Sequence, residues 1–290
     1  MMSTLYDSAL PIDIARTFLP DRRLLARLLG FAAQGGGGTK FEIRDQTGIP
    51  TGESTGKVAP MIWYAAGMGL IKPDLQADMW QVPLTTLGQV IFQEDPFLNE
   101  RQTLWLLHLL LCRRLSRHST QGVADAWFTI FADSQLRLGK TVNTDQAHKL
   151  LQERYGQLGY LKALAGVLLR MYQESNAWGL AAILTISGTG ETYQFQAAPT
   201  ETSYYPLYTT YLYLMWDSFF VNEQQMALDQ FIQETRLLNT LRWEAKDLNT
   251  WLEWMVAYGW IQLDRQTGSA LLLRLKTTSA ALHHTYSGLL

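Results

Sequence analysis

Three carboxylates and a histidine are the residues of this sequence best suited to catalysis. Asp95, with Glu94 and Glu100 nearby, offers the oxygen ligands that Mg²⁺ prefers, and His108 offers an imidazole that can activate water. A structural interpretation competes with this one, in which Asp95 caps a helix that begins around Pro96 and His108 is a hydrogen-bonded core residue. We favour the structural interpretation, because position 108 lies several helical turns beyond position 95.

A polar segment at residues 52–57 precedes a predicted helix and contains Ser54, Thr55 and Lys57. It resembles a phosphate-binding loop, as do residues 139–141. Neither segment combines the four-residue gap of that motif with a following Ser or Thr, and neither follows a strand, so nucleotide hydrolysis is not expected. The start of a helix still attracts anions through its free N–H groups and its dipole. We therefore predict that Ser54, Thr55 and Lys57 contact DNA phosphates, with simple helix capping as the alternative.

The densest basic cluster consists of Arg113, Arg114 and Arg117, followed by His118. Such a run is typical of a solvated helix end, and it also suits contact with DNA phosphates. Lys246, at the expected start of another helix, is a weaker candidate of the same kind. We predict these four cations, without the histidine, as DNA contacts.

The remaining candidate metal ligands, a cysteine and two adjacent histidines, do not indicate a metal site. The single cysteine, Cys112, excludes an intramolecular disulfide and a cysteine-rich zinc site, and its leucine neighbours indicate a buried thiol. The pair His283-His284 lies in an expected tail from Thr277 onward and lacks partner ligands. We expect no cofactor, except Mg²⁺ if the chain nicks DNA.

The 10 Trp and 13 Tyr residues offer surfaces on which bases can stack. Their helical spacing favours packing or a protein partner instead. Trp216, Trp251 and Trp254 are predicted to lie in the core.

The elements expected to position these residues at the N-terminal end are three helices and a hairpin. The helices follow Asp21 and cover residues 41–48 and 56–67, and two short strands follow within residues 69–84. This order is typical of a winged helix, a variant of the helix-turn-helix. The alternative is an ordinary small helical domain with a hairpin.

The C-terminal end shows a similar pattern, which predicts a second winged helix. Residues 223–241 are expected to form one long helix, and a helix ending at Tyr258 is followed by strands on both sides of a turn at 266–269. The middle is predicted to be helical, with a hairpin around residues 187–190 and an aromatic helix at 206–220.

The fold class predicted is thus mainly α with small β-hairpins, with winged-helix modules flanking a helical middle. The predicted domains are residues 1–94, 95–222 and 223–290.

Composition sets limits on this interpretation. The hydrophobic content of 47% and charged content of 17% are typical of a globular protein. The net charge of −2 counts against nucleic-acid binding unless the cations gather on one face. We find no secretory signal, and the most apolar stretch, residues 104–111, is too short to span a bilayer, so a cytoplasmic location is expected.

The segment order and one block resemble a bacterial family known as a domain of unknown function, found in DNA phosphorothioation (Dnd- and Ssp-type) and related phage-defence gene clusters. The block reads Asp-Pro-Phe-Leu-Asn-Glu at residues 95–100 and Thr-Leu-Trp-Leu-Leu-His at 103–108. Weaker matches are Thr55-Gly56-Lys57 with Trp63-Tyr64, Leu84-Thr85-Thr86-Leu87-Gly88, and the hairpin at Tyr193-Gln194-Phe195 before the helix ending at Trp216. The resemblance covers residues 19–275, departing at Asn99 and in the short, Gly-rich N-terminal segment.

The resemblance implies a role beside a DNA-modifying or DNA-restricting complex, and the Ssp-type branch is associated with strand nicking. Our first hypothesis is a DNA-binding component that positions partner proteins on duplex DNA. The alternatives are an Mg²⁺-dependent DNA nickase of such a system, and a scaffold that binds proteins without DNA contact.

Overall fold

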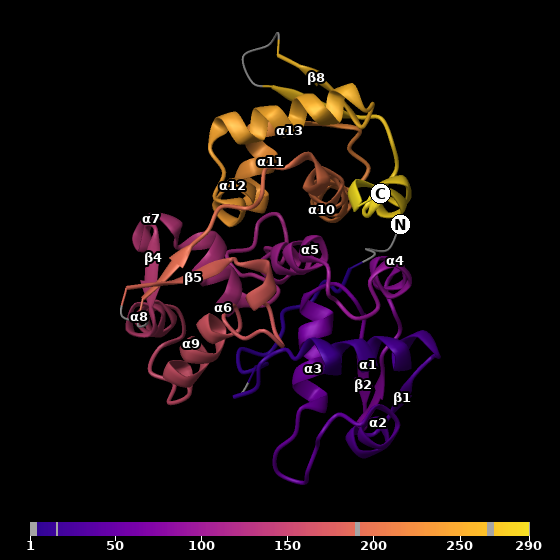
Figure 1. The fold of residues 1–290 in the computed structure, drawn as a ribbon, viewed down its shortest axis with the longest axis vertical. Coiled ribbons are helices and arrows are strands. Elements are labelled where there is room, and N and C mark those ends of the chain that lie inside the picture. Colours follow the sequence, from indigo (N-terminus) through magenta and orange to yellow (C-terminus); the bar gives the residue numbers. More distant parts are fainter. Residues whose placement is uncertain (1–4, 16, 189–191, 266–269, 290) are drawn as a thin grey trace.

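The computed structural model describes residues 5–15, 17–188, 192–265 and 270–289. In this part the chain is mainly helical, as predicted, and its named strands form three antiparallel sheets of three strands each. Figure 1 shows the N-terminal segment at the bottom, the middle at the left and the C-terminal segment at the top. The turn predicted at 266–269 and part of the turn at 187–190 lie outside the described residues.

The N-terminal segment contains the predicted three helices and hairpin, together with a two-residue strand. Its elements are α1 (Arg22–Ala33), β1 (Gly37–Gly38), α2 (Lys40–Thr47), α3 (Val58–Gly67), β2 (Asp74–Gln76) and β3 (Met79–Gln81).

The middle segment contains the predicted hairpin and one strand that the sequence did not reveal. Its elements are α6 (Asp125–Trp127), the π-helical η1 (Phe128–Asp133), α7 (Gln135–Leu138), β4 (Thr141–Asn143), α8 (Thr144–Tyr155), α9 (Leu161–Arg170), the 3₁₀ turn η2 (Gly179–Ala181), β5 (Leu184–Ser187) and β6 (Thr192–Phe195). Strand β4 pairs with β6, so the hairpin becomes a sheet.

The C-terminal segment corrects two predictions. Its elements are η3 (Thr202–Tyr204), α10 (Tyr205–Phe219), β7 (Gln225–Ala227), α11 (Leu228–Thr235), α12 (Leu237–Leu241), α13 (Ala245–Ala257), β8 (Ile261–Asp264), β9 (Leu271–Arg274), α14 (Thr278–His284) and η4 (Ser287–Leu289).

The prediction of one long helix at 223–241 was wrong. Residues 225–227 pair with β9 as a strand, and Arg236 adopts a left-handed φ of 56° between two short helices. The prediction of a tail from Thr277 onward was also wrong. Thr277 caps α14, which packs against α10 and buries Ala281 and Leu282.

One order of elements occurs in all three segments: helix, short strand, two or more helices, and a hairpin. In each sheet the last strand lies in the centre and pairs with the first, giving the orders β1-β3-β2, β4-β6-β5 and β7-β9-β8. We call the three segments the first, middle and last units. Local signals contribute to the repeat, because α2 and α8 both begin directly after a short strand with a capping box, Thr39 with Glu42 and Asn143 with Gln146.

Helices α4 (Thr86–Glu94) and α5 (Arg101–Leu111) connect the first unit to the rest. Every residue of α5 after Arg101 is buried, and the helix contacts α3, η2 and α10, one element from each unit. Figure 1 shows α5 at the centre of the molecule. The core is accordingly continuous through all three units, and it includes Trp216 and Trp251 as predicted, with Trp254 partly buried at its edge.

The helix expected from Pro96 begins later, at Arg101. Residues 95–100 form a turn in which the Asp95 carboxylate accepts the N–H groups of Asn99 at 2.8 Å and Glu100 at 3.0 Å. Asp95 is therefore a capping residue, as expected, but it caps this turn and not a helix starting at Pro96. No helix in the described part of the chain combines the length and apolarity needed to cross a lipid bilayer.

The contact between α4 and the first unit allows no side chain at Gly88. A Cβ there would overlap the carbonyl oxygen of Leu70, which the backbone N–H of Thr85 holds at 3.0 Å. We expect Gly88→Ala to lower the free energy of unfolding by about 3 kcal/mol, measured by urea denaturation. Gly166→Ala in α9 is the control, since a Cβ there meets open space and should stabilise the helix by roughly 1 kcal/mol. Equal effects of the two variants would contradict this account of the contact.

Candidate nucleic-acid interface

The loop before α3 is a closed structure that ends in exposed hydroxyls. The N–H of Gly52 donates to the carbonyl of Thr55 at 2.7 Å, and the N–H of Lys57 donates to that of Pro50 at 2.8 Å. The N–H of Val58, in the first turn of α3, donates to the Thr51 hydroxyl at 3.2 Å. The loop therefore keeps its shape without using the side-chain hydroxyls of Ser54 and Thr55, which are exposed at its tip.

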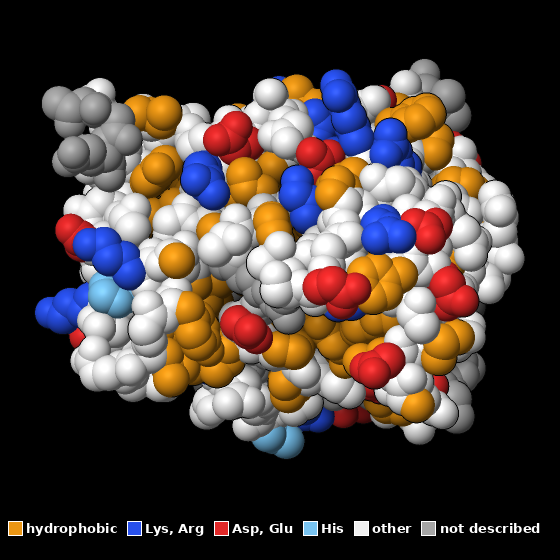
Figure 2. Space-filling view, turned by 90° about the horizontal axis from the view of Figure 1, so that it is seen from below, with side chains coloured by type: hydrophobic (Ala, Val, Ile, Leu, Met, Phe, Trp, Pro, Cys, Tyr) orange, Lys and Arg blue, Asp and Glu red, His pale blue; other side chains and the backbone are white. Residues whose placement is uncertain are grey.

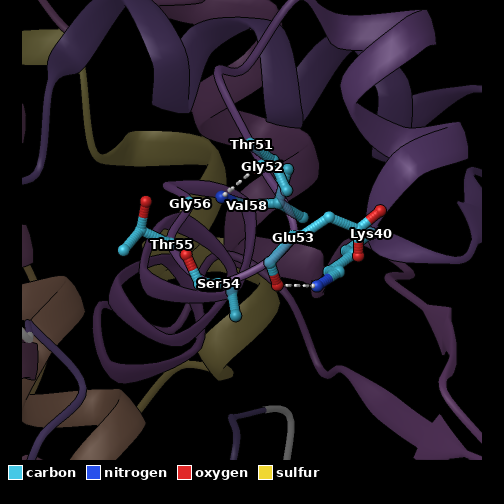
Figure 3. Close-up of a pocket in the computed structure, with 9 residues that line it drawn as sticks. Lys40, Thr51, Gly52, Glu53, Ser54, Thr55, Gly56 and Val58 are labelled. Atoms are coloured by element: carbon cyan, nitrogen blue, oxygen red, sulfur yellow. Dashed lines mark hydrogen bonds between the residues drawn. The ribbon is translucent and has the colours of Figure 1, made fainter.

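A cavity of about 210 Å³ lies beside this loop and includes a cation that the sequence analysis missed. The Lys40 ammonium donates to the carbonyl of Glu53 at 2.9 Å, and in the view of Figure 3 Lys40 and Thr55 lie on opposite sides of the loop. Lys57 is half-buried at the base of the loop, with its Nζ 5.8 Å from the ring centre of Phe18. The capping box of Thr39 and Glu42 is the sequence signal that places Lys40 in the first turn of α2.

Helix α3 itself is not presented to solvent. All its residues are buried except Ala59 and Trp63, which are half-buried. A helix that reads bases must enter a groove, and the exposed residues next to α3 are those of the loop before it, residues 52–55.

Arg113 does not fit its predicted role, because it is only 3% exposed. Its guanidinium donates to the carbonyls of Leu110 and Tyr6, each at 2.6 Å, and to that of Gly67. Desolvation by burial lowers its pKa to about 10. Arg113 thus joins the end of α5 to the first unit, and a phosphate contact would require it to leave these carbonyls.

Arg114 and Arg117 connect α5 to the last unit. Arg114 pairs with Glu234 at 2.8 Å, and Arg117 pairs with Glu223 at 3.1 Å. The Arg117 guanidinium also lies 4.7 Å from the ring centre of Phe220. The predicted basic cluster is therefore largely neutralised within the fold, and it is not a freely solvated helix end.

Lys246 is exposed in the first turn of α13, as predicted, but it has acidic neighbours. Its ammonium lies 3.0 Å from the Glu244 carboxylate, and this hydrogen bond, together with the charges of Glu244 and Asp247, raises the pKa of Lys246. Figure 2 shows the same mixture elsewhere, since on that face Lys and Arg side chains lie among Asp, Glu and apolar side chains without forming one basic patch.

The catalytic candidates have structural partners. His108 is fully buried, its Nδ1 lies 2.8 Å from the Tyr172 hydroxyl, and Cys112 is buried next to it, as the sequence predicted. Asp95 is 5% exposed, with both carboxylate oxygens bonded to backbone N–H groups. Among the described residues no group of three or more His, Cys, Asp or Glu side chains is placed to hold a metal ion. Asp95 and His108 are thus engaged by partners within the fold.

Two crystal structures share this architecture over nearly the whole chain. A structure of SspB matches with a TM-score of 0.72 at 16% identity, covering 99% of this chain and 90% of that one. This chain has the SspB fold. A magnesium-bound SspB structure matches with a TM-score of 0.70 at 15% identity, covering 98% and 89% of the two chains.

The SspB fold confirms the resemblance drawn from the block at residues 95–108. No protein-family model and no curated protein sequence matches the chain. At 15–16% identity the likeness to SspB establishes the fold and assigns no residue a role.

Acid is expected to destabilise the fold through His108. Desolvation by burial, and secondarily the charge of Arg242, lowers the pKa of His108 from 6.5 to about 3. Below pH 6.5 the unfolded chain therefore binds a proton that the folded chain does not, so this contribution to stability is complete above that pH and is lost as the pH falls towards 3. Urea denaturation across this range should show a weaker pH dependence for His108→Gln, with exposed His118→Gln as the control. A profile unchanged in His108→Gln would refute this assignment.

Proposed function

We propose that this chain is a DNA-binding component of a bacterial DNA-modification system of the phosphorothioation type, or of a related phage-defence system, and that it positions partner proteins on duplex DNA. The observation that carries the proposal is the SspB fold, which extends over at least 98% of the chain. The block at residues 95–108 links the sequence to the same kind of gene cluster.

We also propose that the three units are winged helices. Helix, strand, helices and hairpin, with the first strand paired to the last, is the element order of that motif. The proposal extends the two modules expected from the sequence to three. It also gives each unit a hairpin that serves as a wing beside the DNA backbone.

The contact residues proposed in the first unit are Ser54, Thr55 and Lys57. The hydroxyls of Ser54 and Thr55 are exposed on a loop held by its own hydrogen bonds, and Lys57 and Lys40 supply cations at its base and side. Lys246 is the contact proposed in the last unit. The three arginines at 113, 114 and 117 are left out of the proposal, because their guanidinium groups are engaged inside the fold.

Two alternatives have specific support. A magnesium-dependent nickase is supported by the magnesium-bound SspB structure, although among the described residues no group of three or more His, Cys, Asp or Glu side chains is placed to hold a metal ion. A scaffold that binds only proteins is supported by the mixed charge around Lys246 and on the face in Figure 2. With a net charge of −2, DNA binding by the isolated chain should be weak and sensitive to salt.

The proposal is tested by incubating the full chain with supercoiled plasmid and Mg²⁺ across a salt series, reading retardation and nicking from the same gel. We expect retardation without nicking, fading steeply as salt rises. Open circles that require Mg²⁺ and disappear in Asp95→Ala would establish the nickase instead. If low salt gives neither result, DNA binding by this chain alone is wrong and the scaffold is favoured.

The contact at the start of α3 is tested by Lys57→Gln. Loss of one phosphate contact should weaken duplex binding several-fold at low salt and reduce the slope of log K against log salt by about 1. Lys149→Gln, which removes an exposed lysine from α8, is the matched control. Identical salt slopes for the two variants would remove Lys57 from the interface.

A further inference from the structure

A cavity of about 820 Å³ lies outside the interface described above. It is bounded by α1, the end of α4, the turn at residues 95–100 and the segment at 175–176. Its lining combines guanidinium, aromatic and amide groups, from Arg22, Arg23, Arg27, Phe97, Asn99 and Asn176.

The turn at residues 95–100 holds an aromatic ring out towards solvent. Phe97 is 68% exposed, while the next residue, Leu98, is fully buried with a left-handed φ of 54°. The Asp95 carboxylate holds one side of the turn, and Arg22 holds the other by donating to the Leu98 carbonyl at 3.0 Å and the Asn99 side-chain oxygen at 2.7 Å. The fold therefore fixes the backbone that exposes Phe97.

Two further cations that line the cavity come from α1. Arg23 and Arg27 are four residues apart, on the same face of α1, and both are exposed. Neither forms an ion pair with any residue that the structure describes. They differ in this respect from Arg114 and Arg117, which have acidic partners.

The cavity also offers both kinds of hydrogen-bonding group. The Asn99 side-chain oxygen accepts from Arg22, which leaves its NH₂ group without a described partner. The Asn176 NH₂ group donates to Asp21 at 3.0 Å, which leaves its oxygen as an acceptor without a described partner. The edges of nucleic-acid bases carry donors and acceptors together, so they can use both amide groups.

We propose that this cavity binds a nucleotide of a single-stranded nucleic acid, with its base stacked on Phe97 and its phosphates on Arg23 and Arg27. Stacking on an aromatic ring beside a cationic groove is the general mode of single-strand binding. A base within a duplex is already stacked on its neighbours, so its face is not accessible to Phe97. The inference rests on the proposed function, because it assigns a single-stranded segment to a DNA-binding component.

The test is fluorescence anisotropy of a labelled oligo-dT with the full chain at low salt, compared with a duplex of the same length. We expect Phe97→Ala to weaken single-strand binding about tenfold and to leave duplex binding unchanged. Arg23→Gln with Arg27→Gln should weaken single-strand binding and reduce its salt dependence. The controls are Leu136→Ala, at a 99% exposed apolar residue, and Arg170→Gln, at an exposed arginine of α9. Because Phe97 is exposed, its variant should unfold at the wild-type temperature.

Competition experiments distinguish a site for a free nucleotide from a site for a nucleotide within a strand. Displacement of oligo-dT by dTMP would support a site for a single nucleotide, and displacement only by longer oligonucleotides would support a strand. If a polyglutamate peptide displaces oligo-dT as effectively as an oligonucleotide does, the cavity binds any polyanion by charge, and the proposal is overturned. Equal affinities of Phe97→Ala and Leu136→Ala would also overturn it. If the chain binds duplex but not oligo-dT, only this inference fails, and if it binds neither, the proposed function fails with it.

Discussion

Helix α5 has almost no surface of its own in contact with water, and the three units are arranged around it. A helix that is apolar on every side is stable only when other elements cover each face. Here α3, η2 and α10 cover it, one from each unit. Its few polar groups add specific contacts, since the Trp105 indole N–H donates to the Ala181 carbonyl at 3.1 Å and the Thr103 hydroxyl lies 2.8 Å from that of Tyr286. The units are thereby fixed in one arrangement around a shared core.

This arrangement engages three arginines that the sequence analysis expected to contact DNA. Arg113 binds carbonyls of the first unit, while Arg114 and Arg117 bind carboxylates of the last unit. Among the cations left outside these contacts are the half-buried Lys40 and Lys57 beside one loop and the exposed Arg23 and Arg27 on α1. A chain with an acidic balance can bind nucleic acid only through such local groups, which is why weak and salt-sensitive binding is expected of it alone.

The turn at residues 95–100 connects the core to the surface. Asp95 and Leu98 are buried and set its backbone, and Phe97 between them is exposed. The same short motif therefore has a structural part and an accessible part. The sequence analysis weighed Asp95 as a metal ligand or a cap, and the two N–H groups on its carboxylate favour the cap.

The sequence by itself determined the features that depend on local patterns. These are the helices of the first unit, the buried states of His108 and Cys112, and the family resemblance that the SspB fold confirms. Tertiary structure decided what depends on distant partners. Strands β4 and β7 have three residues each and exist because a later strand pairs with them, and α14 forms where it packs against α10. The burial of Arg113 likewise depends on carbonyls from residues 6 and 67, which no local pattern reveals.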